Sequence, residues 1–260
     1  MPRTPADDVH PVMPGCEAWS SPGGGPHGAL VLHGFTGNPV SMRPLAEALA
    51  EAGFTVELPR LPGHGTSIED MVHTGWDDWL AEAERSLAAL AARSAEGRCI
   101  VVGLSMGGAL TAAVAEGHPE LAGIVLINAP VVASSEMTTA VAAMLDGGME
   151  TMESIGGDIA DPASEELSYD ATPLRALLTM LDAGNEVRAR LGDITMPALV
   201  ITSRQDHVVN PEDSNILVAE IDGPVEHLWL EKSFHVATLD YDRALVESAT
   251  VAFARKVTAD

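Results

Sequence analysis

Three residues in the sequence are of the types that nucleophilic catalysis by serine requires: Ser105, Asp206 and His235. A serine hydroxyl holds almost no alkoxide at neutral pH, so it needs a base within hydrogen-bond reach, and that base needs a group that orients it. Serine, aspartate and histidine follow one another along the chain in an order known for such triads. We therefore expect Ser105 to be the nucleophile, His235 the general base and Asp206 the residue that orients the base.

Ser105 lies at the centre of the pentapeptide Gly103-Leu104-Ser105-Met106-Gly107. The apolar run 99–102 before it predicts a strand, and residues 108–115 after it predict a helix. A G-x-S-x-G turn in that context is typical of a nucleophile elbow, whose glycines let the strand and the helix approach closely. An ordinary glycine-rich turn between a strand and a helix gives the same pattern. The assignment of Ser105 therefore depends on the other two residues.

Apolar runs of strand length alternate with helical patterns along much of the chain, which predicts parallel βαβ units in a doubly wound α/β sheet. The expected strands are 28–33, 54–58, 99–102, 123–128, 198–202 and 227–230. Ser105, Asp206 and His235 each follow one of these strands. Because the carboxyl ends of parallel strands meet at one edge, where such sheets bind ligands, the three side chains are expected to converge there.

The alternation stops from Pro130 to about Leu191, where only helical patterns occur, around 138–152 and 173–190. We expect residues 131–191 to form a helical cap inserted in a core made of residues 1–130 and 192–260. An insertion after a central strand would lie across the ligand site. Methionines in this segment fit either a pocket for varied acyl chains or ordinary core packing: Met137, Met144, Met149, Met152 and Met180.

Other residues compete for the roles of acid and base. Asp193 precedes its strand and so belongs to the opposite edge of the sheet, whereas Asp240 follows closely behind His235. The remaining histidines of interest lie in turns, in a loop or at a helix end, where bracing or capping is the simpler role: His33, His64, His118 and His207.

Ester hydrolysis by a serine also needs two backbone N–H groups that bind the oxyanion. In the expected arrangement one belongs to the residue after the nucleophile, Met106, and the other to the loop after an early strand. That loop is Gly34-Phe35-Thr36-Gly37, so Phe35 is the expected second donor. Its side chain can pack in the core at the same time, because only its main chain is used.

Several motifs resemble those of bacterial monoacylglycerol lipases and related carboxylesterases. The motifs are His33-Gly34-Phe35-Thr36-Gly37, Pro62-Gly63-His64-Gly65, Gly103-Leu104-Ser105-Met106-Gly107-Gly108, Asp206-His207-Val208-Val209 and Ser233-Phe234-His235-Val236-Ala237-Thr238-Leu239-Asp240. The resemblance implies an α/β-hydrolase fold, an acyl-enzyme on Ser105, and neither a metal nor an organic cofactor. It extends into the cap through 154–158 and 166–169.

The same resemblance assigns roles to two cap residues. Ile155 would contribute an apolar wall for the acyl chain, and Glu166 a carboxylate that binds the glycerol hydroxyls. Glu165 stands beside Glu166 and leaves the register of this carboxylate open. The alternative for either glutamate is a solvated position on the cap surface.

Composition limits the partners. The chain of 260 residues has a formal net charge of −24, and a surface so acidic repels nucleic acid and anionic lipid headgroups. Its two cysteines, Cys16 and Cys99, lack a metal-ligand spacing and form no disulfide framework. Neither a secretory signal nor an apolar run of about 18 residues is visible. We expect a cytoplasmic protein without stable membrane insertion, and its oligomeric state stays open.

Taken together, these residues predict a serine hydrolase of carboxylic esters, with monoacylglycerols as the expected substrates. One alternative is a short-chain carboxylesterase without a preference for glycerol esters. Another, of a different class, is a non-catalytic ligand-binding protein with the same fold.

Overall fold

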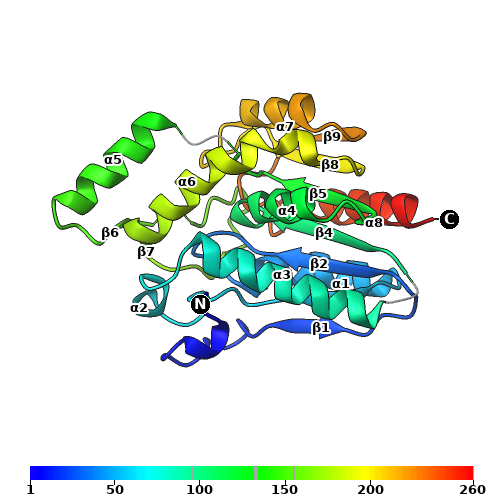
Figure 1. Ribbon diagram of the computed structural model, residues 1–260, viewed down its shortest axis with the longest axis horizontal. Coiled ribbons are helices and arrows are strands. Elements are labelled where there is room, and N and C mark those ends of the chain that lie inside the picture. The colour runs from blue at the N-terminus through cyan, green and yellow to red at the C-terminus, as the bar shows by residue number, and fades with distance from the viewer. Residues whose placement is uncertain (95–96, 132–133, 155, 260) are drawn as a thin grey trace.

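The computed structural model describes residues 1–94, 97–131, 134–154 and 156–259. Its centre is a seven-stranded sheet in the order β1-β3-β2-β4-β5-β8-β9 (Figure 1). Only β1 is antiparallel to its neighbour, and the other five pairings are parallel. The strands are β1 (Trp19–Ser21), β2 (Gly28–Leu32), β3 (Thr55–Leu58), β4 (Cys99–Leu104), β5 (Gly123–Ile127), β8 (Ala198–Ser203) and β9 (Val225–Leu230). The predicted parallel α/β sheet is confirmed.

Helices cover both faces of this sheet, which explains why its strands are apolar throughout. Alternate residues of β2 point to opposite faces: Ala29 and Val31 belong to one apolar cluster, Leu30 and Leu32 to the other. On the first face lie α1 (Arg43–Glu51) and α8 (Arg243–Thr258). On the second lie α3 (Trp76–Arg93), α4 (Met106–Gly117), α6 (Leu174–Ala189) and α7 (Ser214–Glu220) (Figure 1).

The helical segment after Asn38 begins with one 3₁₀ turn, η2 (Pro39–Met42), and continues as α1. The Asn38 side chain accepts a hydrogen bond from the Val40 N–H at 3.0 Å, as an N-cap residue should. The other short helices are η1 (Pro5–Asp7), α2 (Ile68–Met71), η3 (Leu191–Asp193) and η4 (Pro211–Asp213). Within the described ranges, no helix combines the length and the apolar character needed to cross a membrane.

The segment between β5 and β8 differs from the prediction of helices alone. It holds α5 (Ser135–Asp146) and α6, but also the antiparallel strands β6 (Thr151–Glu153) and β7 (Ala171–Pro173). The helix expected to reach Met152 ends at Asp146, because Gly147 and Gly148 follow and Gly148 has φ 84°. Each of the two strands has three residues, too few to leave a hydrophobic period in the sequence.

Candidate active site

Ser105 lies in the turn between β4 and α4 with φ 55° and ψ −123°, a strained conformation for a residue with a side chain. The two glycines around it are required by contact. A Cβ on Gly103 would lie 2.0 Å from the Gly107 carbonyl oxygen, and one on Gly107 would lie 2.3 Å from the Leu32 carbonyl oxygen. The close approach of strand and helix expected for a nucleophile elbow is therefore present around Ser105.

Asp206 and His235 meet on the loops that follow β8 and β9. The His235 Nδ1 lies 2.7 Å from the Asp206 Oδ2, and the two side chains are 8% and 2% exposed. The Asp206 Oδ1 accepts hydrogen bonds from the backbone N–H groups of Val208 and Val209, both at 2.8 Å. The carboxylate is thus held from both sides. Because Nδ1 is used by Asp206, Nε2 is the His235 nitrogen that remains for a serine hydroxyl.

Asn128, directly after β5, connects the end of this strand to His235, although sequence reasoning did not single it out. Its side-chain amide donates to the His235 carbonyl oxygen at 2.7 Å, while the Ser105 N–H donates to the preceding residue, Ile127, at 2.8 Å. Asn128 itself has φ 46° and is buried. The signal in the sequence that could have identified Asn128 was a polar residue at the end of an apolar strand. Asparagine also tolerates positive φ better than most residues do.

The loop after β2 lies beside Ser105. A Cβ on Gly34 would be 3.4 Å from the Ser105 Cβ and 3.9 Å from its Oγ. The Phe35 ring packs against Trp79, with ring centroids 5.7 Å apart, so its side chain belongs to the core. In the described part of the chain the backbone N–H groups of Phe35 and Met106 have no protein acceptor. Both are therefore available for an oxyanion.

His33 braces this loop, as expected. Its Nδ1–H donates to the Gly34 carbonyl oxygen at 3.0 Å, and its Nε2 accepts from the Leu61 N–H at 3.1 Å. Burial lowers the pKa of His33 to about 4, so the ring is neutral near pH 7. His64 is likewise buried, with its Nδ1 3.0 Å from the Pro62 carbonyl oxygen. Neither ring has the geometry of the general base.

Glu166 is partly buried and faces the active-site loops, whereas Glu165 is exposed. The Glu166 Oε2 accepts a hydrogen bond from the Gly157 N–H at 2.8 Å, and a Cβ on Gly37 would lie 3.1 Å from its Oε1. Burial raises the pKa of Glu166, with the Gly157 bond and the positive charge of protonated His235 acting in the opposite direction. Ile155 lies outside the described residues.

The residues around Glu166 are fastened to the loop after β2. The Asn38 side-chain amide donates to the Leu167 carbonyl oxygen, and the Tyr169 N–H donates to the Thr36 carbonyl oxygen at 3.2 Å. The Tyr169 hydroxyl donates to the Gly63 carbonyl oxygen at 2.8 Å. These bonds fix the position of Glu166 relative to the loop that carries Phe35.

The competing aspartates have other partners. Asp193 lies in η3 and pairs with Arg190 at 3.1 Å. Asp240 accepts backbone N–H groups, including those of Phe234 and Ala160, both at 2.8 Å, and makes no bond to the His235 ring. Neither aspartate acts as the partner of His235 in this structure.

The competing histidines lie outside the triad as well. His118 is held between Glu84 at 2.8 Å and Glu120 at 2.7 Å at the end of α4. His207 has a side chain that is 61% exposed and pairs with Asp158 at 2.8 Å. Asp158 is a second residue near the site that sequence reasoning did not assign.

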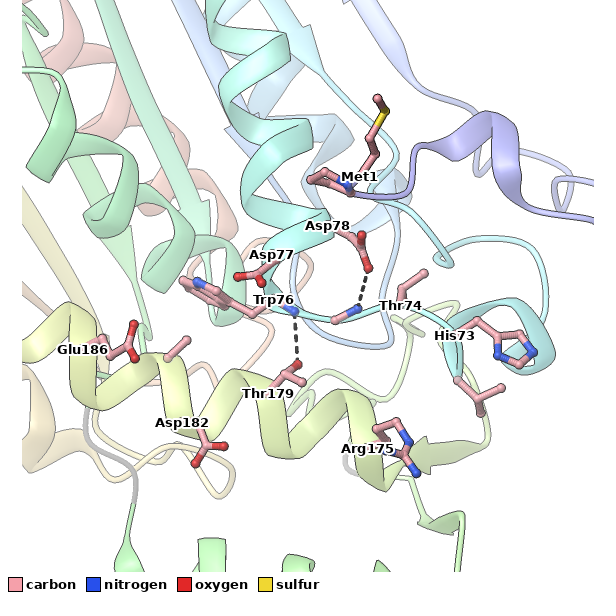
Figure 2. A pocket seen from close by; sticks show the side chains of 14 residues that line it. Met1, His73, Thr74, Trp76, Asp77, Asp78, Arg175, Thr179, Asp182 and Glu186 are labelled. Carbon is pink, nitrogen blue, oxygen red and sulfur yellow. Dashed lines mark hydrogen bonds between the residues drawn. The ribbon is translucent and has the colours of Figure 1, made fainter.

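A cavity of about 860 Å³ opens elsewhere, between the start of α3 and α6 (Figure 2). There the Trp76 N–H donates to the Thr179 Oγ1 at 3.1 Å. The acidic and basic side chains in its lining are Asp77, Asp78, Asp182, Glu186 and Arg175, and His73 lies among them. None of the predicted site residues lines it, so we assign this cavity no part in the chemistry.

Comparisons with known proteins agree with this geometry. The chain is 43% identical to a thermostable monoacylglycerol lipase from Bacillus sp. (strain H-257), over 96% of this chain and 98% of the lipase. It is 33% identical to a carboxylesterase from Bacillus subtilis (strain 168), over 90% of this chain and 94% of the esterase. A solved structure from work on two metagenome-derived lipolytic enzymes superposes with a TM-score of 0.90 at 41% identity, covering 95% of this chain and all of that one.

A sequence model of the hydrolase family described as serine aminopeptidase, S33, matches residues 26–242. The match spans most of the chain, and the relatives above confirm the resemblance that the motifs indicate. With the sheet order and the elbow geometry, they also confirm the α/β-hydrolase fold. The chain therefore belongs to the serine aminopeptidase S33 family of α/β-hydrolases, together with this lipase and this carboxylesterase.

Proposed function

We propose that this protein hydrolyses carboxylic esters through an acyl-enzyme on Ser105, with monoacylglycerols as its preferred substrates. The His235 Nε2 removes the Ser105 proton while the hydroxyl attacks the ester carbonyl, and Asp206 stabilises the resulting imidazolium. The N–H groups of Phe35 and Met106 stabilise the oxyanion. The alcohol leaves with a proton from His235, and water then releases the acid by the same route.

The observation that carries this proposal is the buried Asp206–His235 hydrogen bond of 2.7 Å. It lies at the edge of the sheet where β4 ends in the strained Ser105. A buried imidazole that is oriented by a carboxylate, at the same edge of the sheet as a strained serine, fits the arrangement that activates a serine.

The preference for glycerol rests on Glu166. Its carboxylate is partly buried near Gly37 and His235, and its Oε1 makes no hydrogen bond to the described residues, so it remains able to accept one from a substrate hydroxyl. We propose that residues 131–191 act as a cap that brings Glu166 to the site and that Ile155 lines the acyl path. The name of the 43% identical relative, a monoacylglycerol lipase, supports this substrate.

A carboxylesterase without glycerol preference is the second candidate, favoured by the 33% identical relative of that name. The two are separated by comparing kcat/KM for 1-monolauroylglycerol with kcat/KM for methyl laurate, which has the same acyl chain. We expect the glycerol ester to be preferred, and Glu166→Gln to reduce this preference by roughly tenfold, as the loss of one hydrogen bond to a charged group would. The exposed neighbour provides the matched control, Glu165→Gln, which should keep the preference. Equal kcat/KM values for the two esters in the wild type would leave the carboxylesterase as the function.

We place this activity in the cytoplasm, on small ester molecules. The net charge of −24 supports this location, because it repels anionic surfaces such as lipid headgroups. Fractionation of cells that express the chain with its natural ends tests the location, and recovery in the membrane fraction would contradict it.

A further inference from the structure

Asp158 contacts the two loops that carry Asp206 and His235. Residues 204–210 after β8, which include Asp206, are called the acid loop, and residues 231–240 after β9, which include His235, are called the base loop. The Asp158 Oδ2 accepts the His207 N–H of the acid loop and the His235 N–H of the base loop, each at 3.1 Å. Its Oδ1 accepts from the His207 Nδ1 at 2.8 Å. One carboxylate therefore joins the two loops, at His235 itself and at the residue that follows Asp206.

The environment of Asp158 suits this role. Its side chain is 17% exposed, so its hydrogen bonds are only weakly contested by water. Its carbonyl oxygen also accepts the Val236 N–H at 3.1 Å, which gives the base loop a second attachment to the same residue. A residue with four hydrogen bonds to two loops restricts how far those loops can move apart.

Asp158 also belongs to the segment that carries Glu166. The residue before it, Gly157, has φ 80° and donates its N–H to the Glu166 Oε2 at 2.8 Å. Two residues after it, Ala160 donates its N–H to Asp240 of the base loop at 2.8 Å. The inserted segment is thus bound to the base loop at Asp158 itself and two residues after it.

We propose that Asp158 is a positioning residue, supplied by the inserted segment, that holds the acid and base loops together so that His235 stays aligned between Asp206 and Ser105. This inference rests on the proposed function of the triad. It assigns the segment between β5 and β8 a part in assembling the catalytic geometry, in addition to its part in binding substrate.

The chemistry of the contact distinguishes two substitutions. The Oδ2 alone accepts both backbone N–H groups, so the single carbonyl oxygen of asparagine can replace it in Asp158→Asn. Alanine leaves both N–H groups without this acceptor and frees the loops. A displacement of about 1 Å in a catalytic group can cost roughly 10² in rate, so we expect Asp158→Ala to lower kcat between 10- and 100-fold.

The test compares wild type, Asp158→Ala, Asp158→Asn and a matched control, Asp170→Ala, which removes an exposed aspartate of the same segment. Three kinetic quantities are measured: kcat and KM for p-nitrophenyl butyrate, and the rate at which a fluorophosphonate labels Ser105. The low-field proton NMR signal of the His235–Asp206 hydrogen bond is recorded for each variant. Thermal unfolding shows that each variant is folded.

We expect Asp158→Ala to lose kcat with little change in KM, to label slowly, and to weaken or broaden the low-field signal. Asp158→Asn should stay within about threefold of wild type, and Asp170→Ala should match wild type. An alanine variant with wild-type kcat and signal would overturn the inference, as would an asparagine variant that is folded yet as slow as the alanine variant. Failure of wild type to label would refute the proposed function instead, and the NMR comparison would still test the positioning role.

Discussion

Replacing Glu116 with glutamine should stabilise the protein above pH 7 and leave its stability almost unchanged below pH 5. Glu116 lies near the end of α4, the helix that begins after Ser105, and its side chain is 4% exposed. Its Oε2 is 3.3 Å from Arg190, but its Oε1 is buried without a partner among the described residues. A carboxylate in this position is short of hydrogen bonds, whereas a neutral carboxyl or amide is tolerated better.

The magnitude follows from the pKa. Burial raises the pKa of Glu116 from 4.5 to about 7, with Arg190 opposing this change and Asp193 adding to it. Because the folded protein binds this proton more tightly, the stability contributed by the group is complete below pH 4.5 and is lost as the pH rises through about 7. One pKa unit corresponds to 1.36 kcal/mol, so the loss by pH 9 is about 3 kcal/mol. Glutamine imitates the protonated form and avoids this loss.

The assay is urea unfolding at constant ionic strength between pH 5 and pH 9, from which the free energy of unfolding is plotted against pH. The difference between Glu116→Gln and wild type should be below about 1 kcal/mol at pH 5 and reach about 3 kcal/mol at pH 9, a value that already includes the pair with Arg190 because that pair contributes to the pKa. Glu51→Gln removes the same charge from an exposed position on α1 and should show no such pH dependence. Parallel curves for Glu116→Gln and wild type would refute the reasoning, because they would mean that Glu116 ionises equally in the folded and unfolded states.

Two further predictions concern the site. Asp206→Asn should keep KM and lower kcat by about 10⁴, as the equivalent change does in a serine protease, because the amide favours the wrong tautomer of His235. Steady-state ester hydrolysis measures both constants, and a kcat near the wild-type value would mean that another carboxylate orients His235. Gly103→Ala should destabilise the fold by about 3 kcal/mol or more, because its Cβ would meet the Gly107 carbonyl oxygen at 2.0 Å. Calorimetry measures the change, and Gly117→Ala, at the open end of α4, is the control that should keep the wild-type melting temperature.

The fold was predictable because its strands are buried on both faces. Continuous apolar runs such as Ala29 to Leu32 and Ile124 to Ile127 cannot be placed on a half-exposed sheet, and helical patterns between them impose parallel pairing. The expected positions of Ser105, Asp206 and His235 followed from the same reasoning, because each lies in the segment that follows a strand of that sheet.

The residues that escaped prediction act through hydrogen bonds between segments far apart in the sequence. Asn128 holds the carbonyl oxygen of His235, which is 107 positions away, and Asp158 bridges two loops that lie beyond the next helix. No periodicity marks such residues, since a single side chain makes the contact. The first residues of the chain are a similar case: Asp8 forms a buried ion pair with Arg60 at 2.5 Å, which composition alone did not suggest.

The most direct test of the central claim is covalent labelling of the wild-type protein and Ser105→Ala with a fluorophosphonate, followed by peptide mass spectrometry. We predict one label per wild-type chain, located on the peptide that contains Ser105, with loss of ester hydrolysis in proportion to labelling. Ser105→Ala should be folded, unlabelled and inactive. Labelling of another residue, or ester hydrolysis that persists in Ser105→Ala, would contradict the account.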